Sequence, residues 1–372
     1  MPSVHEARHW QPLEGGRVLC TLCPHDCRIG PGGRGACAVR YNEDGRLYTL
    51  VYDKVVARHL DPIEKKPLFH FLPGSTAYSI GTVGCNLRCA FCQNWEIAQW
   101  PKEHLAKGGA AAADAHEPIC PPLASLERAI PGEHVTPESI VAAALKSGAR
   151  TIAYTYTEPT IFYELAYDTA ALARKRGLKN VFVSNGFIGE AAQRELATVL
   201  DAVNVDLKAF REETYRRVSR ARLEPVLEAI ARYRELGVWV EVTTLVVPGM
   251  NDSDEELHSI ARFLAAVGAD VPWHVSQFHP AYRMLDAPVT PVERLRRAVE
   301  IGRAAGLRYV YEGNVPGEKG ENTCCHACGA LLVERYGFYV RRNAIRDGAC
   351  PKCHAKVAGI GMTPEAGGKA AT

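Results

Sequence analysis

Between residues 76 and 315 the chain alternates short apolar runs with longer amphipathic segments. The runs are almost continuously hydrophobic, as strands are when both faces of a parallel sheet are covered. The segments between them have helical spacing, and several end in glycine. This alternation predicts an α/β fold, either a barrel or an open sheet, with ligands at the carboxyl ends of the strands. The expected strands are TAYSIGTV, TIAYTY, NVFVSN, AVNVDL, VWVEVTTLVV, WHVSQF and LRYVYEG.

Four regions depart from this alternation. We interpret residues 1–75 as a Cys-rich N-terminal cap, whose knot of cysteine, glycine and proline is too poor in apolar residues to fold by burial alone. Residues 101–135 are rich in alanine, glycine and proline and predict a flexible surface insertion, in which Cys120 is an incidental thiol. Residues 320–360 predict a zinc-ribbon-like module, and residues 361–372 predict a disordered tail.

Charge and composition exclude few classes of protein, but the cysteines are informative. The formal net charge of +2 does not favour a nucleic-acid-coating or membrane-surface protein. Because the sequence has no run of 18 apolar residues and no signal-peptide core, we expect a cytoplasmic protein without a membrane association. In that compartment thiols stay reduced, and clustered cysteines bind metals. Twelve of the 13 cysteines fall into three groups.

The middle group is the stretch GTVGCNLRCAFCQNW, with Cys85, Cys89 and Cys92. Three thiolates on one loop can bind three irons of a cubane 4Fe–4S cluster and leave the fourth iron open, which is typical of a catalytic metal site. The loop follows the first expected strand, where α/β folds build their active sites. Phe91 is placed to shield such a cluster from water. The alternatives are three unrelated thiols or three zinc ligands.

The spacing C-x3-C-x-F-C after a first strand resembles the radical S-adenosylmethionine (SAM) superfamily. The resemblance implies a partial (β/α)6-type barrel, a 4Fe–4S cluster and SAM. It also implies reductive cleavage of SAM to a 5′-deoxyadenosyl radical that abstracts hydrogen from a substrate. In such enzymes the chemistry belongs to the cofactor, and the protein supplies orientation and shielding.

Polar residues at the ends of the later strands are the candidate SAM contacts. YTYTEPTIF resembles the family segment that binds the SAM amino group, so Glu158 is expected to offer its carboxylate to the ammonium; capping of the next helix is the alternative. His274 and His279 follow another strand, although either is more readily explained as a packed or solvated histidine. The cofactor-binding candidates are Phe91, Tyr156, Thr157, Glu158, Ser184, Asn185, Asp206 and Lys208.

Longer motifs narrow the resemblance. DPIEKKPLFHF, YTYTEPTIFYE, VSNGF and DLKAF resemble the activating enzymes of glycyl-radical proteins, related to pyruvate formate-lyase activase. With the N-terminal C-x2-CPH-x-C and the C-terminal CPKC, the arrangement resembles the radical enzyme of the AmmeMemoRadiSam system. This resemblance implies a reductant such as flavodoxin or ferredoxin, a protein substrate, and Memo-like or AMMECR-type partners.

The two outer cysteine groups suit metals as well. The C-terminal group has two C-x2-C pairs, whose spacing is typical of tetrahedral zinc, with Cys324 as a spectator. The N-terminal group fits either zinc or an auxiliary iron–sulfur cluster, and His25 is an alternative ligand. The expected ligands are Cys325, Cys328, Cys350 and Cys353 for zinc, and Cys20, Cys23, Cys27 and Cys37 for zinc or an auxiliary cluster.

These observations support one leading hypothesis and two alternatives. The leading hypothesis is a radical SAM enzyme, similar to an activase, that acts on a protein or peptide. The first alternative is radical modification of RNA or a small metabolite. Arginines interleaved with aromatics would serve RNA binding, although a solvated hairpin is the favoured interpretation of Arg335, Arg341, Arg342 and Arg346. The second alternative is a non-catalytic iron–sulfur or zinc protein for electron transfer or docking.

Overall fold

The computed structural model describes residues 5–105, 122–315 and 319–364. Its centre is an eight-stranded sheet in the order β16-β15-β14-β13-β12-β11-β9-β8, in which only the edge strand β8 runs antiparallel to its neighbour. All seven apolar runs expected as strands are strands, which confirms the predicted α/β fold. The strands are β8 (Ala57–Pro62), β9 (Thr76–Gly81), β11 (Thr151–Tyr154), β12 (Lys179–Ser184), β13 (Ala202–Asp206), β14 (Trp239–Val246), β15 (Trp273–Gln277) and β16 (Val310–Gly313).

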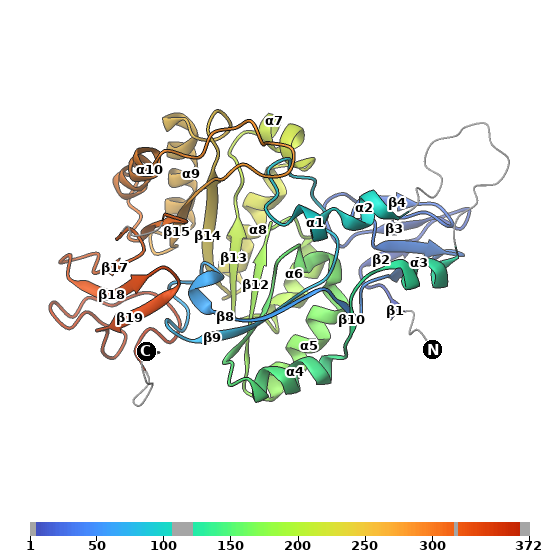
Figure 1. Ribbon diagram of the computed structural model, residues 1–372, viewed down its shortest axis with the longest axis horizontal. Helices are drawn as coiled ribbons and strands as arrows, with labels where there is room; N and C mark the ends of the chain where they lie inside the picture. Colours follow the sequence, from blue (N-terminus) through green and yellow to red (C-terminus); the bar gives the residue numbers. More distant parts are fainter. Residues whose placement is uncertain (1–4, 106–121, 316–318, 365–372) are drawn as a thin grey trace.

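Helices join successive strands and pack against them (Figure 1). The longer helices are α4 (Pro137–Lys146), α5 (Tyr163–Lys175), α6 (Glu190–Ala197), α8 (Glu224–Glu235), α9 (Asp254–Val267) and α10 (Val292–Ala304). The shorter ones are η1 (Ile63–Lys65), α1 (Trp95–Ala98), α2 (Trp100–His104), α3 (Leu123–Ala129), η2 (Pro159–Phe162), α7 (Glu212–Thr214) and the π-helix η3 (Tyr215–Ser219). Of the helices in the described ranges, none has the length and apolar character needed to span a membrane.

The N-terminal segment lies at one end of the sheet, shown in blue in Figure 1. It contains two small antiparallel sheets, and a third pairs β7 with β10. Arg40 joins the segment to α5 through a buried ion pair with Glu164, with 2.5 Å between Nη2 and Oε1. The strands are β1 (His5–Glu6), β2 (Trp10–Pro12), β3 (Val18–Cys20), β4 (Cys27–Ile29), β5 (Arg40–Glu43), β6 (Arg46–Thr49), β7 (Lys54–Val55) and β10 (Glu133–His134).

The C-terminal module, residues 319–364, lies at the opposite end of the sheet (red in Figure 1). It is built on the antiparallel strands β17 (Thr323–Cys324), β18 (Leu331–Tyr336) and β19 (Tyr339–Asn343). Arg335 was considered as part of an exposed basic face, but its side chain is fully buried and stacks on Phe69. Arg341, Arg342 and Arg346 are exposed. The buried arginine therefore serves as an anchor between module and sheet.

Residues 63–72 follow β8 and pack against the later strands β13, β14 and β16. The backbone amides of Phe69 and His70 donate to the Glu241 carboxylate of β14, at 3.0 and 2.8 Å. Asn204 of β13 donates to the Pro67 carbonyl, and the Tyr311 hydroxyl of β16 lies 2.6 Å from His70 Nε2. The segment therefore contacts three strands that are far from it in the sequence.

The expected insertion at residues 101–135 is only partly described. Residues 106–121, with Cys120, lie outside the described residues. Leu123–Ala129 forms helix α3, although the composition showed no helical periodicity, because Leu123 and Leu126 bury one side of the helix in the core. Of the expected tail, residues 365–372 also lie outside the described part of the chain.

Candidate active site and metal centres

The three central cysteines lie on a loop directly after β9. Two glycines shape this loop. A Cβ on Gly81 would lie 2.7 Å from the Thr155 carbonyl oxygen, so only glycine lets β9 and β11 approach this closely at their ends. Gly84 directly precedes the first cysteine and has a φ of +104°, a backbone conformation that favours glycine. Cys85 and Cys89 are buried, and Cys92 is half-buried.

One cavity of about 390 Å³ joins the three cysteines to the strand ends. Its volume lies in the range of small-molecule sites. It brings together residues that are more than 100 positions apart in the sequence. Seven of the eight cofactor-binding candidates line it, namely Phe91, Tyr156, Thr157, Ser184, Asn185, Asp206 and Lys208. The three thiols line one part of the cavity, and the rest of the cavity adjoins them. This arrangement fits a cubane cluster that has three cysteine ligands and one open iron.

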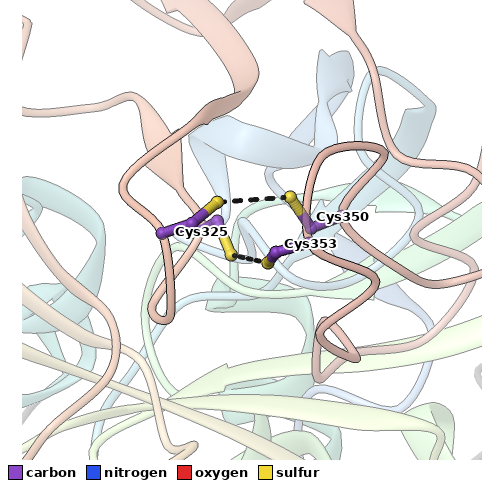
Figure 2. A group of neighbouring side chains, drawn as sticks. Cys325, Cys350 and Cys353 are labelled. Carbon is purple, nitrogen blue, oxygen red and sulfur yellow. Dashed lines mark hydrogen bonds between the residues drawn. The ribbon is translucent and has the colours of Figure 1, made fainter.

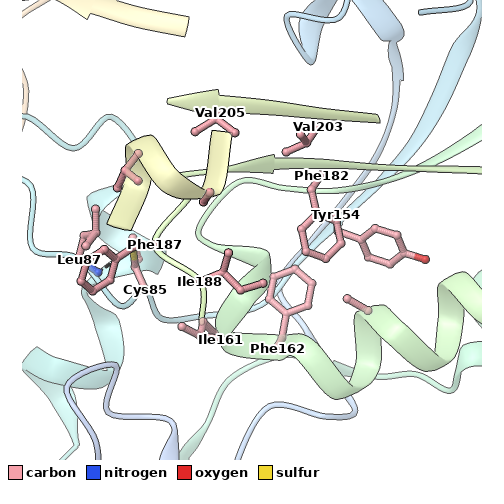
Figure 3. Close-up of a cluster of buried hydrophobic side chains, with 14 of the residues drawn as sticks. Cys85, Leu87, Tyr154, Ile161, Phe162, Phe182, Phe187, Ile188, Val203 and Val205 are labelled. Atoms are coloured by element: carbon pink, nitrogen blue, oxygen red, sulfur yellow. Dashed lines mark hydrogen bonds between the residues drawn. The ribbon is translucent and has the colours of Figure 1, made fainter. Parts of the chain in front are cut away.

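Two amides donate hydrogen bonds to Cys85 Sγ, as suits a thiolate. The Leu87 amide and the Asn185 side-chain amide donate to Cys85 Sγ at 3.3 and 3.7 Å. Ser219 Oγ, at the end of the π-helix, lies 3.4 Å from Cys89 Sγ. Burial raises the pKa of the Cys85 thiol, and Figure 3 shows Cys85 at one end of a buried apolar cluster with Leu87 and Phe187. A bound metal would be needed to hold such a thiol deprotonated.

Glu158 has a different position from the one expected. Its carboxylate is fully buried and accepts hydrogen bonds from the Thr160 amide, the Ser184 hydroxyl and the Asn185 amide, at 2.9, 2.8 and 2.8 Å. Burial raises its pKa. The carboxylate caps η2, and it is not among the residues that line the cavity. Its oxygens are therefore occupied by the protein, and Glu158 positions the strand end that carries Ser184 and Asn185.

Lys208 brings a positive charge into the cavity. Its side chain is 16% exposed, and Nζ lies 3.1 Å from an Asp206 carboxylate oxygen. Burial alone would lower the pKa of this ammonium, but the charges of Asp206 and Cys89 raise it above its usual value. Nζ also lies 5.8 Å from the ring centroid of Phe91. Lys208 therefore stays protonated and offers a cation beside the cysteine loop.

A second polar group joins the predicted Tyr156 to two lysines of the cavity wall that were not predicted, Lys65 and Lys66. Lys65 and Lys66 donate to the Asp61 carboxylate, and so does the Tyr156 hydroxyl, at 3.0, 2.7 and 3.0 Å. Although burial would raise the pKa of Asp61, these lysines hold it well below its usual range. The sequence motif DPIEKK indicates a family resemblance. The hydrophobic periodicity, however, does not indicate that this motif lies beside the later strands.

Other cavity residues were also missed. Gln93, Asn94, Gln99, Thr243, Ser276 and Asn314 line it, and so does Phe338 from the turn between β18 and β19. Phe338 is 39% exposed, so the C-terminal module contributes an aromatic side chain to the edge of the cavity. Conversely, His274 is buried within β15 and donates to Glu241 at 2.7 Å, which makes it a packed histidine.

The C-terminal cysteines form a compact centre. Figure 2 shows their sulfur atoms facing one another from two turns. The distances are 3.6 Å from Cys325 Sγ to Cys353 Sγ and 3.7 Å from Cys328 Sγ to Cys350 Sγ. All four sulfurs lie within 4.8 Å of one another, so this group can bind a metal ion. Cys324 is exposed and stands apart from it.

The N-terminal cysteines surround a separate, small cavity. Cys20 and Cys27 are directly paired across β3 and β4, and Cys23 lies in the turn between them. Cys37 approaches from the following loop. His25, considered as an alternative ligand, bonds the Asn86 carbonyl through Nε2 at 2.8 Å and is not among the residues that line this cavity.

Comparison with known families agrees with the central site. The model of the Radical SAM superfamily matches residues 79–264, which include the cysteine loop and the strands from β11 to β14. The chain belongs to the radical SAM superfamily. Membership in this superfamily implies a 4Fe–4S cluster and SAM as cofactors.

Individual relatives of this radical SAM protein extend the comparison. An uncharacterized protein of Methanocaldococcus jannaschii is 43% identical, over 90% of this chain and 92% of its own length. A GTP 3′,8-cyclase of Aquifex aeolicus is 26% identical, over 50% of this chain and 51% of its own. Among solved structures, a domain of pyruvate-formate lyase-activating enzyme from Bacteroides vulgatus is 16% identical, with a TM-score of 0.37, over 44% of this chain and 98% of that one.

Proposed function

We propose that Cys85, Cys89 and Cys92 hold a 4Fe–4S cluster with one open iron, and that SAM fills the adjoining cavity. The observation that carries this proposal is the shared cavity, which the three thiols line together with polar residues from the strand ends. When bound, the cluster supplies the electron that cleaves SAM reductively and yields the 5′-deoxyadenosyl radical for hydrogen abstraction.

Within this proposal the protein side chains bind, orient and shield. Ser184, Asn185 and Thr157 form the polar part of the cavity wall beside which SAM would lie, and Lys208 offers a cation to its carboxylate. Phe91, which is 3% exposed, keeps water from the cysteine loop. Glu158 acts as a positioning residue, because its three internal hydrogen bonds hold the Ser184–Asn185 turn.

For the substrate we propose a protein or peptide, as for an activase. The support is the edge of the cavity, where Phe338 sits between the exposed aromatic residues Tyr336 and Tyr339. Exposed aromatics around an active-site opening suit an extended peptide. Burial of Arg335 weakens the alternative of RNA, because it removes one cation from the proposed basic face. A flavodoxin or ferredoxin as reductant, and Memo-like or AMMECR-type partners of an AmmeMemoRadiSam system, rest on the sequence motifs.

Anaerobic reconstitution with iron, sulfide, dithionite and SAM tests the enzyme directly. Formation of 5′-deoxyadenosine is expected for the native chain and for Cys324→Ala, which changes an exposed cysteine outside the cavity. Cys89→Ala should abolish it. No 5′-deoxyadenosine from a chain that carries the reconstituted cluster would refute the proposal.

Deuterium transfer distinguishes the substrate classes. A deuterated candidate peptide should deliver its label to 5′-deoxyadenosine, whereas transfer from RNA or from a small metabolite would replace the activase-like assignment. We also propose zinc for the C-terminal centre, since its sulfur spacing suits a tetrahedral Zn–S bond length of about 2.3 Å. Metal analysis of the chain purified without added iron should find about one zinc ion, which Cys325→Ser/Cys328→Ser should remove.

A further inference from the structure

We infer that Cys20, Cys23, Cys27 and Cys37 hold a second 4Fe–4S cluster rather than zinc, and that this cluster passes electrons to the central one. The first part rests on the spacing and surroundings of the four thiols. The second part rests on the proposed function and on the contacts between the two cysteine loops.

The C-terminal centre shows the spacing that a single ion requires in this same protein. With four Zn–S bonds of about 2.3 Å, tetrahedral geometry puts the sulfurs roughly 3.8 Å apart. The measured separations of 3.6 and 3.7 Å match this value. Within the described ranges, this is the one group of three or more metal-ligating side chains that gathers around a single point.

The N-terminal thiols do not gather in this way, although all four line one cavity. The central cysteines behave alike, since they line a cavity without converging on one point. A cubane keeps its cysteine sulfurs farther apart than a single ion does, because each sulfur binds a different iron. Neither group therefore has the close sulfur spacing of the C-terminal centre, and both suit a cubane rather than a single ion.

The cavity walls suit a charged, sulfur-rich core shielded from water. Leu22 and Ile161 provide apolar walls and are 2% and 1% exposed. The Ala36 amide donates to Cys27 Sγ at 3.4 Å, and backbone donors of this kind stabilise cluster thiolates.

Arg40 supplies an independent sign that a ligand is missing from this cavity. It lines the cavity and is 1% exposed. Its Nη1 and Nη2 donate to the Arg8 carbonyl and to Glu164, at 2.8 and 2.5 Å. Its Nε, however, is buried and has no hydrogen-bond partner among the described residues. A buried N–H group without an acceptor is costly, and a cluster sulfur beside it would fill that role.

The N-terminal and central loops share a wall. A Cβ placed on Gly84, next to Cys85, would lie 3.4 Å from Ile161 Cδ1 and 3.6 Å from the Cys37 carbonyl oxygen. Ile161 also lines the N-terminal cavity. The two cysteine loops are thus in contact through Ile161 and through the backbone at Cys37 and Gly84. One electron from a flavodoxin or ferredoxin would reduce the N-terminal cluster, which is reoxidised as the central cluster gains that electron.

The test uses Cys85→Ala/Cys89→Ala/Cys92→Ala after anaerobic reconstitution. We expect about four iron and four sulfide ions per chain, and an electron paramagnetic resonance signal after reduction that SAM does not change. Iron-free protein, whether with a second zinc ion or with no metal at the N-terminal site, would overturn the inference. Should this variant fail to fold, the native chain decides, with about eight iron ions expected and about four contradicting the second cluster.

The relay is tested with Cys23→Ala/Cys27→Ala, and Cys324→Ala serves as the matched control. The double variant should keep the SAM-responsive signal of the central cluster and form 5′-deoxyadenosine with dithionite, but lose activity with flavodoxin. Equal activity with both reductants would refute the relay. Metal counts require no turnover, so a failure of the proposed enzyme function remains distinguishable from a failure of this inference.

Discussion

Replacement of Arg335 tests whether the C-terminal module is an integral part of the active-site structure. The Arg335 guanidinium donates to the Phe69 carbonyl at 2.9 Å, to the Thr323 hydroxyl at 2.7 Å and to the Glu321 carbonyl at 3.1 Å. Its Nε lies 3.5 Å from a Glu64 carboxylate oxygen, and both side chains are 0% exposed. Arg335→Met keeps most of the apolar stem and removes every one of these bonds.

The expected loss of stability is about 3–5 kcal/mol, the usual effect of removing one partner from a buried ion pair. Burial already raises the pKa of Glu64 despite the nearby arginine. Without that arginine, Glu64 has to be protonated or remain a buried charge. Two buried oxygens, on Phe69 and Glu321, also lose a donor. The 3.5 Å separation makes the ion pair itself weak, so most of the loss should come from the groups left unpaired.

Urea unfolding of the metal-loaded chain measures this loss, with Arg341→Met as the matched control. Arg341 lies on the same hairpin but is exposed, and its guanidinium stacks on Tyr336. We expect that control to change stability by less than about 1 kcal/mol. An effect of Arg335→Met no larger than that of the control would refute the anchoring role.

A double-mutant cycle with Glu64→Gln separates the two contributions. The substituted amide can still accept the hydrogen bond that the Gly74 amide donates to Glu64 at 3.0 Å, but it carries no charge to leave unpaired. The double variant should therefore be less destabilised than the sum of the two single variants. If the two losses of stability simply added, Glu64 and Arg335 would not interact energetically.

Three further changes have defined outcomes. Glu158→Gln should lower stability by about 1–3 kcal/mol, because one buried backbone donor loses its acceptor. It should also weaken SAM binding measured by calorimetry. Unchanged affinity would show that the Ser184–Asn185 turn does not need the carboxylate. Burial lowers the pKa of His70 from 6.5 to about 4, so the unfolded chain takes up a proton there first as the pH falls. Stability should therefore drop by up to about 3 kcal/mol between pH 6.5 and 4, and chemical denaturation should show a shallower drop for His70→Asn. Phe338→Ala should raise KM for a peptide substrate and leave 5′-deoxyadenosine formation without substrate unchanged; an equal loss of both would place Phe338 against SAM instead.

The sheet and the grouping of the cysteines were predictable because their signals are local. A strand such as β14 is mostly apolar, and the three cysteines of the central loop fall within eight positions. Candidates after strand ends could also be named, since parallel strands bring their carboxyl ends to one edge. Seven of the eight cofactor candidates meet at one cavity for this reason.

The remaining features depend on contacts between distant segments, which no local pattern records. Glu158 follows a strand like its neighbours, but its direction is set by the Ser184–Asn185 turn, 26 and 27 residues away. Arg335 looks like one cation of an exposed hairpin until Phe69 and Glu64, more than 260 residues away, are placed around it. Phe338 reaches the cavity only because this anchor positions the hairpin.

The same contacts link the two edges of the open sheet. The edges of the sheet, β8 and β16, do not pair with each other. Residues 63–72 leave β8 and reach β16, where the Tyr311 hydroxyl lies 2.6 Å from His70 Nε2. The C-terminal module reinforces this link, because His70 Nδ1 donates to the Ala358 carbonyl and Phe71 pairs with Ile360. Since the module is small and built around four cysteines that can bind a metal ion, such an ion would help hold the two edges together.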